Sequence, residues 1–243
     1  MTTPVTVVAS VLIVLWSGAF IRSAVGFGDA LLAMPLLTLL VGLQVATPLV
    51  GIASLVVSVV VLATSWRSLN LAASWRLLSM SLLGAPVGLW VFGHADEWIM
   101  HVVLGVVLTG YGAYNLLRPG LPPLRNEAWA FPFGFVAGIL GSAYNTSGPA
   151  VIIYGTMRRW PPATFRATLQ GFFLVNGFII ITGHAFAGLW TPEVLWLAAL
   201  SLPALGLGIL AGAMVQRRIS PAAFSRAVYM MLVALGVIFL LPL

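Results

Sequence analysis

The chain has 243 residues, of which 61% are hydrophobic and 7% are charged. Soluble domains carry roughly 25% charged residues, so this composition excludes a soluble protein and places the chain in a lipid bilayer. The formal net charge is +6, but the arginines are scattered through short connections and form no dense basic face, which argues against nucleic-acid binding. The sequence contains no cysteine, which excludes disulfides, thiolate metal sites and a cysteine nucleophile.

Hydrophobic segments of about the length of a membrane span recur along the chain, since a spanning helix needs about 20 apolar residues. The first of them ends at Arg22 and at the break formed by Gly26 and Gly28. We expect the segments of the first half at 5–21, 30–45, 46–65, 77–93 and 99–117.

Residues 118–128 form the predicted linker between the halves 1–117 and 129–243, and the stretch from Arg118 to Glu127 holds three prolines and two arginines. In the second half a further break lies between the first two segments. We expect the segments of this half at 129–141, 149–157, 162–183, 194–212 and 224–241.

The two halves match segment for segment, with an offset of about 120 residues. Arg67 and Arg76 follow the third segment of the first half, whereas Arg158, Arg159 and Arg166 precede the third segment of the second half. Because each half has an odd number of segments, the second half begins on the opposite side of the membrane from the first, and the arginines move by one connection to stay on the same side. The sequence therefore predicts an all-α integral membrane protein of two inverted repeats, with the arginine-rich connections and the linker cytoplasmic and both termini outside.

The two breaks lie at residues 24–30 and 144–150, where glycines and small polar residues interrupt apolar runs. Paired interrupted helices indicate the binding site of a transporter. The helices that resume at Asp29 and Pro149 would present their free N–H groups and positive dipole ends to a shared pocket. Two such helix N-termini favour an anion, which makes Gly26, Phe27 and Gly28 candidate site residues.

Arg22 strengthens the case for a negative substrate. It lies four residues before the first break, so it lies deep in the membrane if the first segment is a continuous helix. A charge at that depth is costly and is usually functional. The alternative is that Arg22 belongs to a cytoplasmic connection and only follows the positive-inside rule.

The second break offers hydroxyl and amide donors that suit an oxyanion, on Tyr144, Asn145, Thr146 and Ser147, next to Gly148. The alternative for these side chains is helix capping alone. Within the segment 162–183, Gln170 shares a face with Arg166, while Asn176 lies on another face. Polar residues inside a span either form hydrogen bonds between helices or line a site.

Asp29 has three interpretations: a partner of the helix N-terminus, an ion-pair partner of Arg22 while the site is empty, or a proton acceptor that couples transport to the proton gradient. The first, structural interpretation ranks highest. His94, His101 and His184 have no metal-ligand spacing, and we expect all three at the external surface. No metal or other cofactor is predicted.

The sequences Val25-Gly26-Phe27-Gly28 and Tyr144-Asn145-Thr146-Ser147-Gly148-Pro149, with the stretches that follow them, resemble the TauE/SafE family of sulfite and organosulfonate exporters. The resemblance covers nearly the whole chain. It implies a secondary transporter, and an exporter, of small sulfur-containing anions in the bacterial cytoplasmic membrane. Many relatives would have a glycine or an apolar residue at the position of Asp29.

The predicted function is therefore an anion carrier that works by alternating access and is not an enzyme. An intramembrane enzyme would need a nucleophile with a base, or a metal cluster, and no such group occurs at mid-depth. The alternatives are a carrier of another small ion or carboxylate, including a cation bound by Asp29, and a membrane scaffold that transports nothing. The predicted substrate-binding residues are Arg22, Gly26, Phe27, Gly28, Asp29, Tyr144, Asn145, Thr146, Ser147, Gly148 and Gln170.

Overall fold

The computed structural model describes residues 4–63, 71–117, 122–215 and 221–241, and this part of the chain contains α-helices, one 3₁₀ turn and no strand. The first half forms α1 (Val5–Val25), α2 (Asp29–Val41), α3 (Leu43–Ala63), α4 (Leu71–His94) and α5 (Glu97–Leu117). The second half forms η2 (Glu127–Trp129), α6 (Ala130–Tyr144), α7 (Gly148–Met157), α8 (Pro162–Phe186), α9 (Pro192–Val215) and α10 (Pro221–Leu240).

Six of these helices are long and apolar enough to cross a bilayer: α1, α3, α4, α5, α8 and α9. The second helix of each half is short, with 13 residues in α2 and 10 in α7. At a rise of about 1.5 Å per residue, neither reaches across a hydrocarbon core of about 30 Å. The chain is thus a multi-pass α-helical membrane protein, and the predicted fold class is confirmed.

Some predicted boundaries were wrong by several residues. The expected segments 30–45 and 46–65 divide earlier, at Gly42, where φ is 76° and the N–H group donates to the carbonyl oxygen of Thr38 at 3.0 Å. The hydropathy pattern does not reveal this turn because the residues around it are mostly apolar, and the turn depends on backbone geometry and not on polarity. Arg67 and residues 118–121 of the predicted linker lie outside the described residues.

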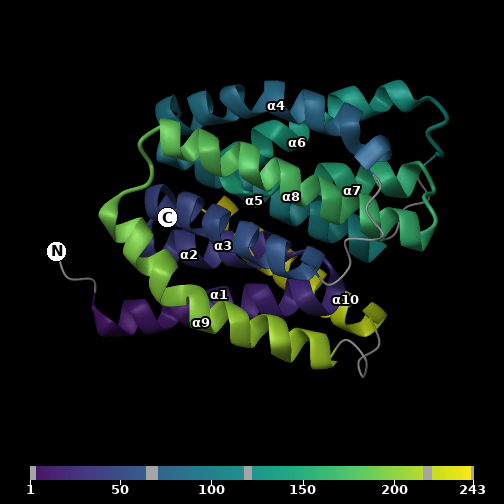
Figure 1. Ribbon diagram of the computed structural model, residues 1–243. Coiled ribbons are helices and arrows are strands. Elements are labelled where there is room, and N and C mark those ends of the chain that lie inside the picture. The colour runs from purple at the N-terminus through teal and green to yellow at the C-terminus, as the bar shows by residue number, and fades with distance from the viewer. Residues whose placement is uncertain (1–3, 64–70, 118–121, 216–220, 242–243) are drawn as a thin grey trace.

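Glycines bring several pairs of helices into backbone contact. A Cβ atom at Gly208 would lie 2.5 Å from the carbonyl oxygen of Trp16, so α9 packs directly against α1. In the same way Gly84 faces the backbone of Phe135, which joins α4 to α6. Small residues allow such close packing in membranes, where packing and not the hydrophobic effect holds helices together. In Figure 1, α1 and α9 lie along one side of the bundle and α4 and α6 along the other.

The pairing of helices follows the correspondence between the halves. In the predicted repeat, each helix of the first half corresponds to the helix five places later, so that α1 matches α6 and α4 matches α9. The contact between α1 and α9 then has its counterpart in the contact between α6 and α4. The contacts α3·α8 and α5·α10 each join a helix to its own counterpart. The α5·α10 pair runs antiparallel, because Gly105 meets Leu240 while Gly112 meets Tyr229. An internal two-fold axis perpendicular to the helices would produce these relations, although the inverted repeat itself stays a prediction.

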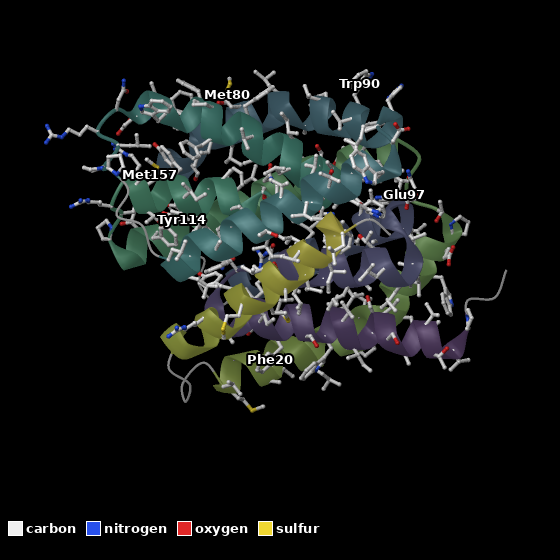
Figure 2. The ribbon with its side chains drawn as sticks, turned by 180° about the vertical axis from the view of Figure 1, so that it is seen from behind. Phe20, Met80, Trp90, Glu97, Tyr114 and Met157 are labelled. Atoms are coloured by element: carbon white, nitrogen blue, oxygen red, sulfur yellow. The ribbon has the colours of Figure 1, made fainter. Side chains whose placement is uncertain are left out.

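Charged side chains gather at one end of the bundle. Glu127 pairs with Arg76 of α4 and lies 3.5 Å from a guanidinium nitrogen of Arg158. Arg158 also donates to the carbonyl oxygens of Leu124 and Arg125, so this end of α7 is tied to the described part of the predicted linker. Figure 2 shows Met157 and Tyr114 at this end, with Trp90 and Glu97 at the other.

Candidate functional site

Both helix breaks result from left-handed backbone. Gly26 ends α1 with φ of 98° and its N–H group donates to the carbonyl oxygen of Arg22, while Gly28 precedes α2 with φ of 101°. Residues that carry a side chain rarely adopt a backbone φ in this range, so glycine is strongly favoured at both positions. In the second break, Asn145 takes the same role at the end of α6, with φ of 53°. Asparagine is the common substitute for glycine at such a helix end.

A cavity of about 40 Å³ lies between the two breaks, with room for about three water-sized groups. It is formed by both halves of the chain, with α3 and α8 completing its wall. Its charged lining residues are Arg22 and Asp29. The other lining residues are Phe27, Gly28, Ala30, Leu31, Ser54, Leu55, Ser58, Asn145, Thr146, Ser147, Gly148, Phe173, Asn176, Gly177 and Ile180.

Arg22 is the cation of this cavity, and its residue is only 3% exposed. Its Nη1 atom lies 3.0 and 3.2 Å from the two carboxylate oxygens of Asp29, and its Nη2 atom donates to the hydroxyl of Ser58 at 2.7 Å. The guanidinium carbon lies 4.9 Å from the ring centroid of Phe173, which is a cation–π distance. The Nε atom of Arg22 is buried and has no hydrogen-bond partner. The guanidinium of this lining residue therefore retains an unused buried donor.

Asp29 is the first residue of α2, and it is buried with 6% exposure. The ion pair with Arg22, one of the three interpretations that the sequence left open for Asp29, is present in the structure with a contact of 3.0 Å. This pairing occupies the carboxylate that a cation carrier would use as a ligand. Within the described residues, no group of three or more His, Cys, Asp or Glu side chains comes together to hold a metal ion.

The N-termini of α2 and α7 both lie at the cavity, because Gly28, Asp29, Ser147 and Gly148 all line it. The first N–H groups of a helix have no partner within the helix and carry a partial positive charge. Ser147 stands at the N-cap position of α7, yet its side chain forms no capping hydrogen bond. Pro149 lies in the first turn of α7, as the sequence predicts, although the helix begins one residue earlier at Gly148.

Three of the predicted site residues lie outside the cavity lining: Gly26, Tyr144 and Gln170. The hydroxyl of Tyr144 donates to the carbonyl oxygen of Met100 at 3.0 Å, which directs it toward α5. The side-chain amide of Gln170 donates to the carbonyl oxygen of Gly26 at 2.9 Å. Gln170 therefore supports the first break from α8, and Gly26 shapes the turn. The other eight predicted residues line the cavity.

Among the lining residues that sequence reasoning missed, four are polar or aromatic: Ser54, Ser58, Phe173 and Asn176. Ser54 and Ser58 are one helical turn apart in α3, and small hydroxyl residues are common in membrane helices, so they gave no distinct signal. The sequence left Asn176 open between a hydrogen bond to another helix and the site lining, and it was not among the predicted site residues. In the structure it is Asn176 that reaches the cavity, and its Oδ1 atom accepts from the hydroxyl of Ser81.

The expectation that His184 is a surface residue was wrong. Its side chain is fully buried, and its Nε2 atom lies 2.8 Å from the carbonyl oxygen of Ser142 in α6. A Cβ atom at Gly51 would lie between His184 Nδ1 and the amide of Asn145. His184 was misplaced because α8 extends beyond the predicted segment, so the histidine falls in its last turn and packs against α6.

Fold and site together define a polytopic α-helical membrane protein in which two broken helices flank an ion-paired cavity, an organisation found in membrane transporters. The family model for "Sulfite exporter TauE/SafE" matches residues 10–239, and the chain belongs to this family. The resemblance seen in the two breaks is thereby confirmed.

Two curated relatives are similar to the chain. "Probable inner membrane transporter protein TsaS" of Comamonas testosteroni is 32% identical over 63% of this chain, a match that spans 65% of that relative's length. "Probable sulfite/organosulfonate exporter TauE" of Cupriavidus necator is 26% identical over 94% of this chain and 91% of the relative. No solved structure matches the chain.

Proposed function

We propose that this protein is a secondary transporter that exports a small sulfur-containing anion, such as sulfite or an organosulfonate, across the bacterial inner membrane. Membership of the TauE/SafE family and the names of two relatives support this class of substrate and this membrane. In the proposed mechanism the anion binds beside Arg22 in the central cavity, between the N-termini of α2 and α7.

The observation that carries the proposal is the buried guanidinium of Arg22. A buried N–H group without an acceptor costs roughly 1–3 kcal/mol, so the free Nε atom favours an incoming oxygen acceptor. Arginine suits oxyanions because its donors form a planar fork. The unused N–H groups of two helices add partial positive charge on the same cavity. The small volume of the cavity suits an oxyanion with few heavy atoms.

Two features support alternating access as the mechanism. The cavity is built from both halves of the chain, so a movement of one half against the other would change its surroundings. The pairing of helices is also the one that an inverted repeat would produce. In such a repeat each half can adopt the arrangement of the other, which opens the same site to opposite sides of the membrane.

The test is flux of labelled sulfite and of methanesulfonate in proteoliposomes, with native protein and Arg22→Gln. We expect saturable flux that the substitution lowers by at least about tenfold, because hydrogen bonds to a charged group contribute about 1.5–3 kcal/mol. Arg125→Gln is the matched control, since it makes the same chemical change at an exposed position and should keep native flux.

Arg22→Gln leaves the carboxylate of Asp29 buried without its cation, so loss of flux could reflect misfolding. The double variant Arg22→Gln/Asp29→Asn removes both charges and restores electrical balance. A folded double variant without flux supports the anion site. Native flux in the folded double variant would contradict it, and so would the absence of saturable flux of either anion in folded native protein.

A further inference from the structure

We propose that Asp29 is the residue that couples anion movement to proton movement, by binding one proton when a monovalent anion binds beside Arg22 and releasing it when the anion leaves. This inference rests on the proposed function and adds the coupling ion to it. The step is a simple protonation: the carboxylate of Asp29 takes a proton from the water on the side to which the site is open. No bond other than O–H forms or breaks.

The first argument is the charge of the cavity. Arg22 and Asp29 are its charged lining residues, and they neutralise each other at a contact of 3.0 Å. A monovalent anion added to this pair would leave a net charge of −1 in a buried site. Burial of uncompensated charge is strongly unfavourable, and a group in that position shifts its ionisation instead. Protonation of Asp29 restores neutrality, with Arg22 balanced by the anion.

The second argument is competition for one guanidinium. Both carboxylate oxygens of Asp29 lie on Nη1 of Arg22, and Ser58 accepts from Nη2, which leaves Nε without a partner. An anion that seeks two parallel hydrogen bonds from Arg22 therefore meets a carboxylate already on the same group. A neutral Asp29 binds the guanidinium less strongly and yields its place. The anion and the proton thus favour each other's binding.

The third argument is that no other described titratable group faces Asp29. The cavity residues from α1, α3, α7 and α8 include Arg22 but no histidine and no second carboxylate. A smaller cavity of about 10 Å³ on Asp29 adds uncharged residues of α1, α2, α3 and α9. The described part of α10, which also packs against α2, carries Arg226, which is exposed. The side chain of Arg166 in α8 lies outside the described part of the structure.

These arguments predict how the empty carrier returns. With Asp29 ionised, the pair with Arg22 is neutral, so the empty site can cross between its two states without a buried net charge. With the anion bound, a protonated Asp29 keeps the site neutral again. Net transport then moves one proton with each monovalent anion in the same direction, so the outward concentration gradient of the anion has to drive export against the inward proton gradient. A site with the neutral Asn in place of Asp29 would leave Arg22 uncompensated whenever the anion is absent.

The experiment compares native protein with Asp29→Asn in proteoliposomes, with methanesulfonate as the probe because it stays ionised throughout the pH range used. A pH-sensitive dye inside the vesicles reports proton movement when an anion gradient is applied. In native protein we expect the interior to acidify as the anion enters. In Asp29→Asn we expect anion exchange to continue, with half-saturation at a lower concentration because the competing carboxylate is gone.

In Asp29→Asn, proton movement and net uptake should fall to the level of protein-free vesicles, because the empty carrier cannot return. Asp96→Asn is the matched control, since this aspartate is exposed between α4 and α5, and it should keep native coupling. Net uptake of methanesulfonate by native protein without acidification of the vesicle interior would overturn this inference and leave the proposed function intact. Proton-coupled net uptake by Asp29→Asn would also overturn it. If folded native protein neither exchanges nor accumulates methanesulfonate or sulfite, the proposed function itself fails.

Discussion

At the scale of single residues, the orientation of Arg22 depends on three neighbours from three different helices. Asp29 of α2 and Ser58 of α3 accept its hydrogen bonds, and Phe173 of α8 lies against its guanidinium. The hydroxyl of Ser58 in turn donates to the carbonyl oxygen of Ser54 at 2.7 Å. This bond uses the hydroxyl hydrogen, so the oxygen of Ser58 is left to accept from Arg22. The guanidinium is therefore held in place before any substrate arrives, which lowers the entropic cost of binding.

We predict that Ser58→Ala destabilises the protein and weakens anion binding. The substitution leaves Nη2 of Arg22 buried without its acceptor, at a cost of about 1–3 kcal/mol. Thermal unfolding in detergent should show a lower midpoint than native protein, and the anion concentration for half-maximal flux should rise. Ser10→Ala is the control, because the hydroxyl of Ser10 bonds only to its own helix and is far less buried. An unchanged midpoint and unchanged half-saturation would show that Ser58 does not hold Arg22.

At the scale of elements, each break is held by a helix of the other half. The first break is supported by Gln170 of α8, which donates to the carbonyl oxygen of Gly26. The second break is supported by α3, where the carbonyl oxygen of Thr47 accepts from the side-chain amide of Asn145. This mutual support between the halves matters because a broken helix leaves polar backbone groups that need hydrogen-bond partners inside the membrane. The partners come from the helices that complete the cavity wall.

The contact between α1 and α9 gives an element-scale prediction. Gly208→Ala places a Cβ atom 2.5 Å from the carbonyl oxygen of Trp16 and 3.0 Å from the Cβ atom of Ala19, so the two helices must separate. We expect the free energy of unfolding to fall by about 1–3 kcal/mol, as for other overpacked contacts. Unfolding by a denaturing detergent, followed by circular dichroism, measures this change.

Gly206→Ala is the control within the same helix, because a Cβ atom there meets nothing within 4 Å. It should leave stability unchanged or raise it by up to about 1 kcal/mol through its better helix propensity. Equal effects of the two substitutions would mean that α9 does not depend on close packing against α1.

The location of the cavity between the two breaks could be predicted from the sequence, but only part of its lining. Glycines and polar residues inside apolar runs mark the breaks, because such residues have few other reasons to occur there. Which side chains face the cavity depends on helix rotation and on packing partners that lie far away in the sequence. Tyr144 therefore turned out to contact Met100, and Ser58 and Asn176 reach the cavity from α3 and α8. The burial of His184 follows from the same kind of long-range packing.

At the scale of the whole molecule, the two ends of the bundle differ in charge. One end carries Arg76, Glu127 and Arg158 in a network of ion pairs. Glu97 and Trp90 lie at the other end, as Figure 2 shows. Because arginine-rich connections stay in the cytoplasm, this asymmetry predicts one orientation, with the end of Glu97 outside the cell.

The orientation can be tested with single cysteines, because the native chain has none and gives no background labelling. We predict that a membrane-impermeant maleimide labels Glu97→Cys in intact spheroplasts, since the Glu97 side chain is 71% exposed. Arg125→Cys, exposed at the end that carries the arginines, should react only after the membrane is permeabilised. The reversed pattern would place the arginine-rich end outside the cell, against the positive-inside rule. Labelling of both variants in intact spheroplasts would mean that these two ends do not lie on opposite sides of the membrane.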